Sequence, residues 1–263
     1  MNLQTISVDN VKFSVARIGE GFPTIMVHGN RDRKEVLYEL ANSLQCDLGG
    51  EYVLVDLRGH GDSEKVKHGY TIDKFVEDLY GICSALGFSK INYIGHSLGS
   101  TIGIRLASKY PTLINRLVLM SAAASFKIGF ERPAFSRNEF RHQLEETNQR
   151  AYKFFFSDDY PEISKKILNN WLNVDFDVHM EMIKLKHPNL TEDARMIQCK
   201  TLILTGNKDK ATTVEDGKKL SELIEKGKFA VIPGSHYMFL ENPNAVEKII
   251  KEFLTNEFKN SDN

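Results

Sequence analysis

Two kinds of strand pattern occur along the chain. Near the start, residues 4–8 and 11–16 alternate apolar and polar side chains around Asp9-Asn10, which predicts a two-residue β-hairpin. Six later runs are apolar without alternation, which is typical of strands covered on both faces in a parallel sheet. These runs are residues 24–27, 52–55, 91–94, 117–120, 201–204 and 229–232.

Helical patterns lie between most of these runs, with apolar positions at spacings of three and four. Pro111 follows the third helical pattern and Asn242-Pro243 opens the last, as helix boundaries favour. Strand followed by helix, repeated along the chain, predicts an α/β fold with a doubly wound, mostly parallel eight-stranded sheet. The predicted helices are residues 33–46, 72–86, 98–109, 214–225 and 245–258.

One long stretch breaks the alternation of strand and helix. Residues 125–196 contain no clear strand, are rich in aromatic side chains and show helical patterns at 138–156 and 163–172. An insertion of this length predicts a small helical cap rather than a loop. The predicted organisation is a core of residues 1–124 and 197–259, a cap of residues 125–196 and a disordered tail of residues 260–263.

The charge balance argues against several classes of partner. With 34 basic and 35 acidic side chains, the net charge is −1, so no global field attracts nucleic acid or an anionic membrane. No apolar run approaches the roughly 18 residues of a membrane helix, and the N-terminus lacks the pattern of a signal peptide. We therefore expect a soluble, cytoplasmic protein whose partner is a small molecule. The oligomeric state is not indicated.

Cysteine and histidine are not arranged for redox or metal chemistry. The three cysteines are far apart, and no CxxC spacing occurs. The eight histidines are scattered and form no pattern of metal ligands. The glycines at 59 and 61 lack the third glycine of a dinucleotide-binding loop. We expect no cofactor and no metal.

The segment Gly95-His96-Ser97-Leu98-Gly99 lies between a predicted strand and a predicted helix. A sharp strand-to-helix turn lifts a serine hydroxyl clear of the sheet, and a Cβ at either glycine would clash there. The N–H of Leu98, at the helix start, is placed to stabilise an oxyanion. A purely structural turn is the alternative. His96 is not the base for Ser97, because adjacent side chains diverge in such a turn.

A nucleophilic serine needs a base within about 2.6–3.2 Å and an acid that orients the base. In this architecture the order along the chain is serine, acid, histidine. Asp209 and His236 occupy those places, each just after a predicted strand, where the carboxyl ends of parallel strands meet. Alone, each residue would be interpreted as a loop residue. Together the three predict a catalytic triad of Ser97, Asp209 and His236.

The loop after the first buried strand reads His28-Gly29-Asn30-Arg31. Gly29 allows close approach of the backbone, so the N–H of Asn30 is the expected second oxyanion donor, and His28 is expected to pin the loop. Arg31 is placed to meet an anionic or oxygen-rich substrate, although a solvated loop arginine is the alternative. Most cap aromatics are expected to pack against one another, and a few to face the substrate. The predicted substrate contacts are His28, Gly29, Arg31, His96 and Trp171.

These motifs together resemble the α/β-hydrolase fold superfamily. The resemblance implies a serine hydrolase that cleaves a small carboxylic ester through an acyl-enzyme on Ser97. It leaves open a carbon–carbon bond hydrolase, a perhydrolase, an acyltransferase or a ligand receptor, because fold does not set function. The chain departs from many relatives at Ser100, at Asn30-Arg31 and at Tyr38. The matching residues are His28, Gly29, Asp56, Arg58, Gly59, Gly61, Ser63, Gly95, Ser97, Gly99, Gly206, Asp209, Gly234, Ser235, His236 and 240–243.

Overall fold

A computed structural model describes residues 2–125 and 135–256. Its strands are β1 (Asn2–Val8), β2 (Val11–Glu20), β3 (Pro23–Val27), β4 (Gly50–Val55), β5 (Ile91–His96), β6 (Ile114–Met120), β7 (Lys200–Gly206) and β8 (Gly227–Ile232). They form one eight-stranded sheet in the order β1-β2-β4-β3-β5-β6-β7-β8. Strand β2 runs antiparallel to β1 and β4, and the other neighbouring pairs are parallel. The predicted fold class is confirmed.

The N-terminal hairpin turns at the predicted dipeptide. Asp9 and Asn10 have φ angles of 49° and 63°, and Val8 pairs with Val11 across the turn. Left-handed backbone at both central positions matches the right-handed twist of the two strands, and Asn and Asp tolerate that conformation better than most residues.

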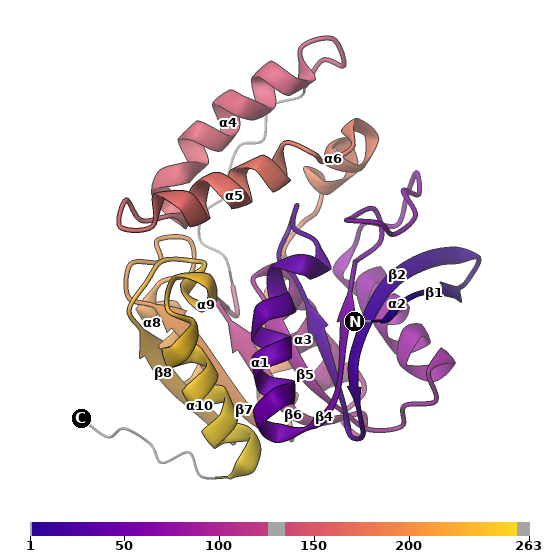
Figure 1. Ribbon diagram of the computed structural model, residues 1–263, viewed down its shortest axis with the longest axis vertical. Coiled ribbons are helices and arrows are strands. Elements are labelled where there is room, and N and C mark those ends of the chain that lie inside the picture. The colour runs from indigo at the N-terminus through magenta and orange to yellow at the C-terminus, as the bar shows by residue number, and fades with distance from the viewer. Residues whose placement is uncertain (1, 126–134, 257–263) are drawn as a thin grey trace.

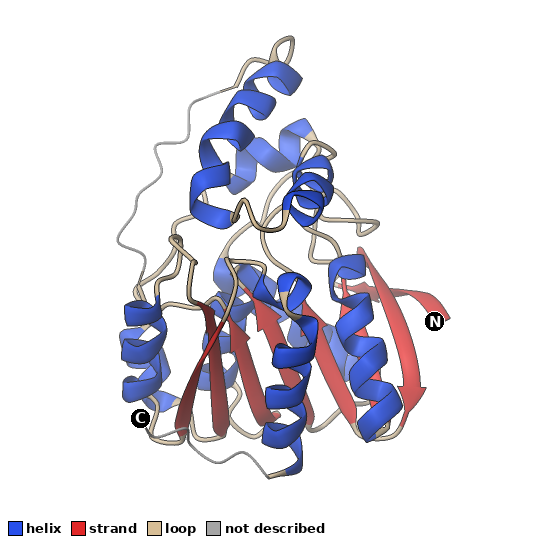
Figure 2. Cartoon of the chain, turned by 60° about the vertical axis from the view of Figure 1, so that its left-hand side comes forward, coloured by secondary structure: helices blue, strands red, loops and turns tan. Residues whose placement is uncertain are grey.

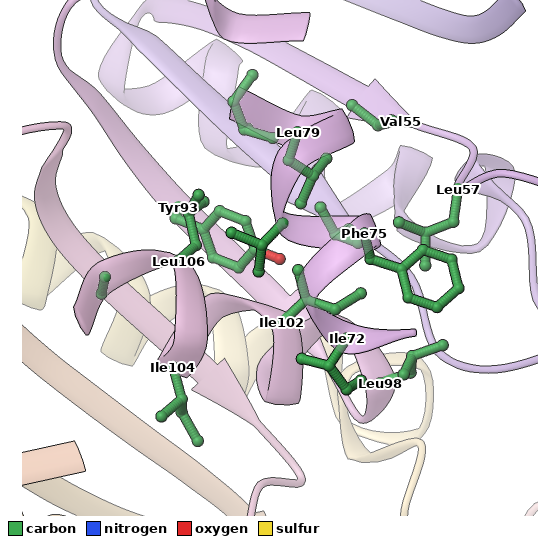
Figure 3. Close-up of a cluster of buried hydrophobic side chains, with 14 of the residues drawn as sticks. Val55, Leu57, Ile72, Phe75, Leu79, Tyr93, Leu98, Ile102, Ile104 and Leu106 are labelled. Atoms are coloured by element: carbon green, nitrogen blue, oxygen red, sulfur yellow. The ribbon is translucent and has the colours of Figure 1, made fainter. Parts of the chain in front are cut away.

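The continuous apolar runs supply two cores, one on each face of the sheet. In β3, Ile25 and Val27 point to one core, while Met26, between them, points to the other. Figure 3 shows part of the first core, where Phe75 packs near Ile102. Because successive side chains in a strand alternate between faces, a strand buried on both sides is apolar at every position.

Two layers of helices cover these faces (Figures 1 and 2). Helices α1 and α10 pack together over one face, while α2, α3 and α8 cover the other. The helix predicted at 33–46 begins instead as a 3₁₀ turn, η1 (Lys34–Leu37). The bounds are α1 (Tyr38–Leu48), α2 (Ile72–Ala85), α3 (Leu98–Lys109), α8 (Val214–Leu223), α9 (Met238–Glu241) and α10 (Pro243–Thr255).

The inserted stretch is helical over its described part. Helices α4 (Phe140–Phe155), α5 (Pro161–Trp171) and α6 (Phe176–Met182) lie over the carboxyl ends of the strands (Figures 1 and 2). A further helix, α7 (Thr191–Met196), packs against α3 and α8 of the core. Residues 126–134 and the predicted tail lie outside the described residues. The proposed domain boundaries therefore stay predictions.

The helices can also be compared in length and polarity with a membrane-spanning helix. Within residues 2–125 and 135–256, every helix is too short or too polar to cross a bilayer.

Candidate active site

Ser97 occupies a strained turn between β5 and α3. Its φ of 51° and ψ of −109° lie outside the regions that L-residues usually adopt, and such a conformation costs on the order of 1–3 kcal/mol. The turn is held by a hydrogen bond from the Ser97 N–H to the carbonyl of Met120, at 2.9 Å. Strain retained at a partly exposed serine is typical of a functional site.

The flanking glycines are required by close backbone contacts. A Cβ on Gly95 would lie 2.5 Å from the carbonyl carbon of Gly99. A Cβ on Gly99 would lie 2.3 Å from the carbonyl oxygen of Val27, on the neighbouring strand. The clash predicted at both positions is confirmed, because real Cβ atoms do not approach backbone so closely.

Asp209 and His236 are brought together from the ends of β7 and β8. Nδ1 of His236 lies 2.8 Å from Oδ2 of Asp209, and both side chains are buried. Oδ1 of Asp209 accepts from the N–H groups of Ala211 and Thr212. Burial would raise the pKa of Asp209, but the charge of His236 and these hydrogen bonds hold it below its ordinary value. Asp209 is therefore an ionised acid that orients the imidazole.

The loops that carry Asp209 and His236 are locked to each other. The N–H of Lys208 donates to the carbonyl of Gly234, at 2.8 Å. A Cβ on Gly206 would lie 2.2 Å from the carbonyl oxygen of Ser235, so only glycine permits this approach.

Ser97 and His236 are not hydrogen-bonded to each other in this structure. Among the described residues, the Ser97 hydroxyl has no hydrogen-bond partner, although the ring of adjacent His96 lies 5.0 Å from the ring of His236. Catalytic hydrogen bonds often close only when substrate is bound. The acid–base pair is formed here, and its link to the serine is not.

Two backbone N–H groups are available near Ser97. Among the described residues, the N–H groups of Leu98 and Asn30 donate to no protein acceptor. Leu98 begins α3, so its N–H has no partner within the helix. Asn30 follows β3, the strand next to β5 in the sheet. The two N–H groups therefore lie at the ends of neighbouring strands.

His28 is buried and anchors the loop after β3. Its Nδ1 donates to the carbonyl of Gly29 at 2.7 Å, and its Nε2 accepts from the N–H of Leu57 at 3.2 Å. Burial lowers the pKa of His28 to about 4, so the ring is neutral. The structure thus gives His28 the predicted pinning role. Direct contact of His28 or Gly29 with substrate stays a prediction.

His96 is also buried and contacts the backbone of the loop that carries His236. Its Nε2 donates to the carbonyl of His236 at 2.9 Å, and the hydroxyl of Ser121 donates to the same oxygen at 3.0 Å. Burial lowers the pKa of His96 to about 3. These contacts give His96 a position beneath the site, and its predicted contact with substrate remains untested.

Arg31 and Trp171 contact each other across the boundary between loop and cap. The guanidinium carbon of Arg31 lies 4.1 Å from the centroid of a Trp171 ring, and its Nη1 donates to Oδ1 of Asn148 at 2.8 Å. Arg31 is therefore engaged with the cap instead of being merely solvated. Whether either side chain also touches substrate stays a prediction.

Asp32 is a buried acid that sequence reasoning did not single out. Its carboxylate accepts from Nε1 of Trp171 at 3.3 Å and from the hydroxyl of Tyr237 at 2.9 Å. Burial raises the pKa of Asp32 to about 6, against the effect of both hydrogen bonds. Its position two residues after Asn30 was the only signal in the sequence.

No described residues form a metal site. Within residues 2–125 and 135–256, no group of three or more His, Cys, Asp or Glu side chains is placed to hold a metal ion. The residues of the loop from Asp56 to Ser63 instead bond within the fold: Arg58 donates to both carboxylate oxygens of Asp78, for example.

Known proteins resemble the chain over most of its length. A family model described as the alpha/beta hydrolase fold matches residues 23–159. AB hydrolase superfamily protein YisY of Bacillus subtilis is 26% identical over 93% of this chain and 96% of its own. 3-Oxoadipate enol-lactonase 2 of Acinetobacter baylyi is 27% identical, over 86% of this chain and 91% of its own. A thermophilic esterase from Thermogutta terrifontis superposes with a TM-score of 0.82 at 23% identity, covering 98% of this chain and all of its own, which shows a shared fold.

Proposed function

The chain belongs to the alpha/beta hydrolase fold family, and from this premise we propose that it is a serine hydrolase that cleaves a small carboxylic ester. The observation that carries the proposal is the hydrogen bond between Asp209 and His236, formed at the strand ends beside the strained turn of Ser97. An oriented imidazole and a partly exposed serine at the same edge of the sheet are the groups that a base and its nucleophile require.

In the proposed reaction, Ser97 attacks the ester carbonyl while Nε2 of His236 takes the hydroxyl proton. The alcohol leaves with that proton, and an acyl-enzyme remains on Ser97. His236 then activates water, which releases the acid and restores the serine. Asp209 holds the Nδ1 proton throughout and stabilises the charged imidazolium.

The oxyanion of each tetrahedral intermediate is assigned to the N–H groups of Leu98 and Asn30. Both N–H groups lack a protein acceptor among the described residues, which supports the assignment. One such donor contributes about 3 kcal/mol to stabilisation of the transition state. The enol-lactonase relative is also consistent with ester chemistry, since a lactone is a cyclic ester.

Turnover of p-nitrophenyl esters of increasing acyl length tests the proposal. Ser97→Ala should lower kcat by roughly 10⁴-fold or more. The control is Ser84→Ala, an exposed serine on α2. Near-wild-type turnover by Ser97→Ala would refute the mechanism. No turnover by the wild-type protein on any ester of the series would refute the ester assignment and favour carbon–carbon bond hydrolysis or a ligand receptor.

A further inference from the structure

One buried carboxylate joins three separate parts of the fold. Asp32 follows β3, Trp171 ends cap helix α5, and Tyr237 directly follows His236. The indole and the phenol both donate to the Asp32 carboxylate, whose residue is 1% exposed. Neither donor is charged, so the carboxylate is desolvated with neutral partners. Burying a carboxylate without a charged hydrogen-bond donor costs free energy and favours its neutral form.

Arg31 reinforces the same contact from the other side of the indole. Its guanidinium lies over the Trp171 ring and also donates to Asn148 on cap helix α4. A cation over an indole face is stabilised by the quadrupole of the ring, so this contact strengthens the docking of the cap. Consecutive residues of one core loop thus contact both α4 and α5.

Aromatic side chains at the end of α4 also pack against His236 and Tyr237. The ring of Phe155, the last residue of α4, lies 4.9 Å from the imidazole of His236 in an edge-on arrangement. The ring of Phe156 stacks on Tyr237 at 5.3 Å and 2°. The main-chain oxygen of Phe155 accepts from the Ser235 hydroxyl at 3.0 Å. Docking of the cap therefore constrains the residues on either side of His236.

Resting on the proposed function, we propose that Asp32 is a positioning residue that couples the docking of the cap to the placement of His236. Through Trp171 it holds the cap, and through Tyr237 it holds the residue next to the proposed base. If either contact is lost, the aromatic packing around the imidazole loosens.

The coupling should depend on pH. Burial raises the pKa of Asp32 to about 6, from an ordinary 3.8. The groups that face it are Arg31 on its own loop, Tyr237 and His236 from the loop after β8, and His96 from the end of β5. Because burial favours the protonated acid, docking is strongest at low pH and weakens as pH rises through about 6. The difference between the two pKa values of Asp32 corresponds to a roughly 100-fold weaker docking equilibrium when the carboxyl is ionised.

Trp171 is the only tryptophan of the chain, so its fluorescence reports on this contact directly. Without substrate, we expect the Trp171 emission of the wild-type protein to shift to longer wavelength as pH rises, with a midpoint near pH 6. Asp32→Asn should abolish this transition, whereas Asp158→Asn, at an exposed cap position, should retain it. A transition that persists in Asp32→Asn, or that is missing from the wild-type protein, would overturn the proposal.

Tyr237→Phe provides a second test that does not need Asp32→Asn to fold. Removing the phenol removes a hydrogen bond that lowers the pKa of Asp32, so the midpoint should move to higher pH. An unchanged midpoint would contradict the proposal. These measurements need no turnover, so they succeed or fail independently of the ester assay.

Activity then tests the link to His236. Asp32→Ala, which removes the acceptor for Trp171 and Tyr237, should lower kcat on p-nitrophenyl esters. Asp32→Asn, whose neutral side chain resembles the protonated acid, should flatten the pH dependence of kcat around pH 6. An emission transition that depends on Asp32, combined with a wild-type kcat profile in Asp32→Asn, would show a cap contact without coupling and would overturn the positioning role.

Discussion

Nε2 of His96 donates to the main-chain oxygen of His236 at 2.9 Å, so the residue beside the proposed nucleophile holds the loop that carries the proposed base. Ser121, at the end of β6, donates to the same oxygen. The ends of three strands are therefore tied to one carbonyl group. Because burial lowers the pKa of His96 to about 3, the ring is neutral at neutral pH and this contact persists there.

Replacing His96 should reduce catalysis by displacing His236. We expect His96→Ala to lower kcat by about 10- to 100-fold, because a shift of about 1 Å in a catalytic group can have such an effect. His96→Gln should retain more activity, since its amide can donate to the same oxygen. His68→Ala, at a side chain that is 86% exposed, is the control. Steady-state kcat and KM check this, with circular dichroism to confirm folding; a wild-type kcat in a folded His96→Ala would contradict the expectation.

The turn at Ser97 should tolerate no side chain at Gly99. Gly99→Ala should lower the free energy of unfolding by about 3 kcal/mol or more, because its Cβ would overlap the carbonyl of Val27. Gly99 lies in α3 and has no positive φ, so its loss comes from the clash alone. Gly49→Ala is the converse case, because Gly49 has a φ of 65° and nothing within 4 Å of its Cβ position; this variant should lose about 1–3 kcal/mol through backbone strain alone. Urea denaturation measures both, and a Gly99→Ala protein as stable as the wild type would show that the clash is relieved.

Arg31 should favour acidic substrates if it contacts them. Arg31→Ala should then lower kcat/KM on an ester with a free carboxylate by about tenfold more than on a neutral ester of equal length, because a charged hydrogen bond is lost. The neutral ester corrects for the loss of the contacts with Trp171 and Asn148. Arg31→Lys should recover part of the preference. Equal effects on both esters would limit Arg31 to holding the cap.

The sheet and the proposed triad were predictable because local patterns encode them. Strands such as β3 are apolar at every position since each side chain enters one of two cores, and the glycines around Ser97 reflect backbone contacts that any such turn imposes. The contacts of Asp32 were not predictable. They join residues 139 and 205 positions apart, and the polar loop Asn30-Arg31-Asp32-Arg33-Lys34 gives no sign that its acid is buried.

The contacts between the cap and the core could not be predicted from the sequence either. The aromatic residues of 125–196 were expected mainly to pack together, and the pattern did not indicate that Phe155 and Phe156 would contact His236 and Tyr237. Such contacts depend on how the inserted helices dock, which no periodicity within a helix determines. The short helices α6 and α7 were also not resolved from the pattern, because one or two turns give too few apolar positions.

Asp209 should make the stability of the fold depend on pH in the acidic range. Its pKa in the folded protein lies below the ordinary 3.8, so its ionised form stabilises the fold above about pH 4. This contribution is lost as pH falls through the lowered pKa. Asp209→Asn lacks it, so the difference in unfolding free energy between wild type and variant should narrow as pH falls below about 4. Urea denaturation at each pH measures the difference, with exposed Asp158→Asn as the control. A difference that widens below about pH 4 would mean that the Asp209 carboxylate is destabilised by its burial, and that its hydrogen bonds with His236 and Thr212 do not compensate.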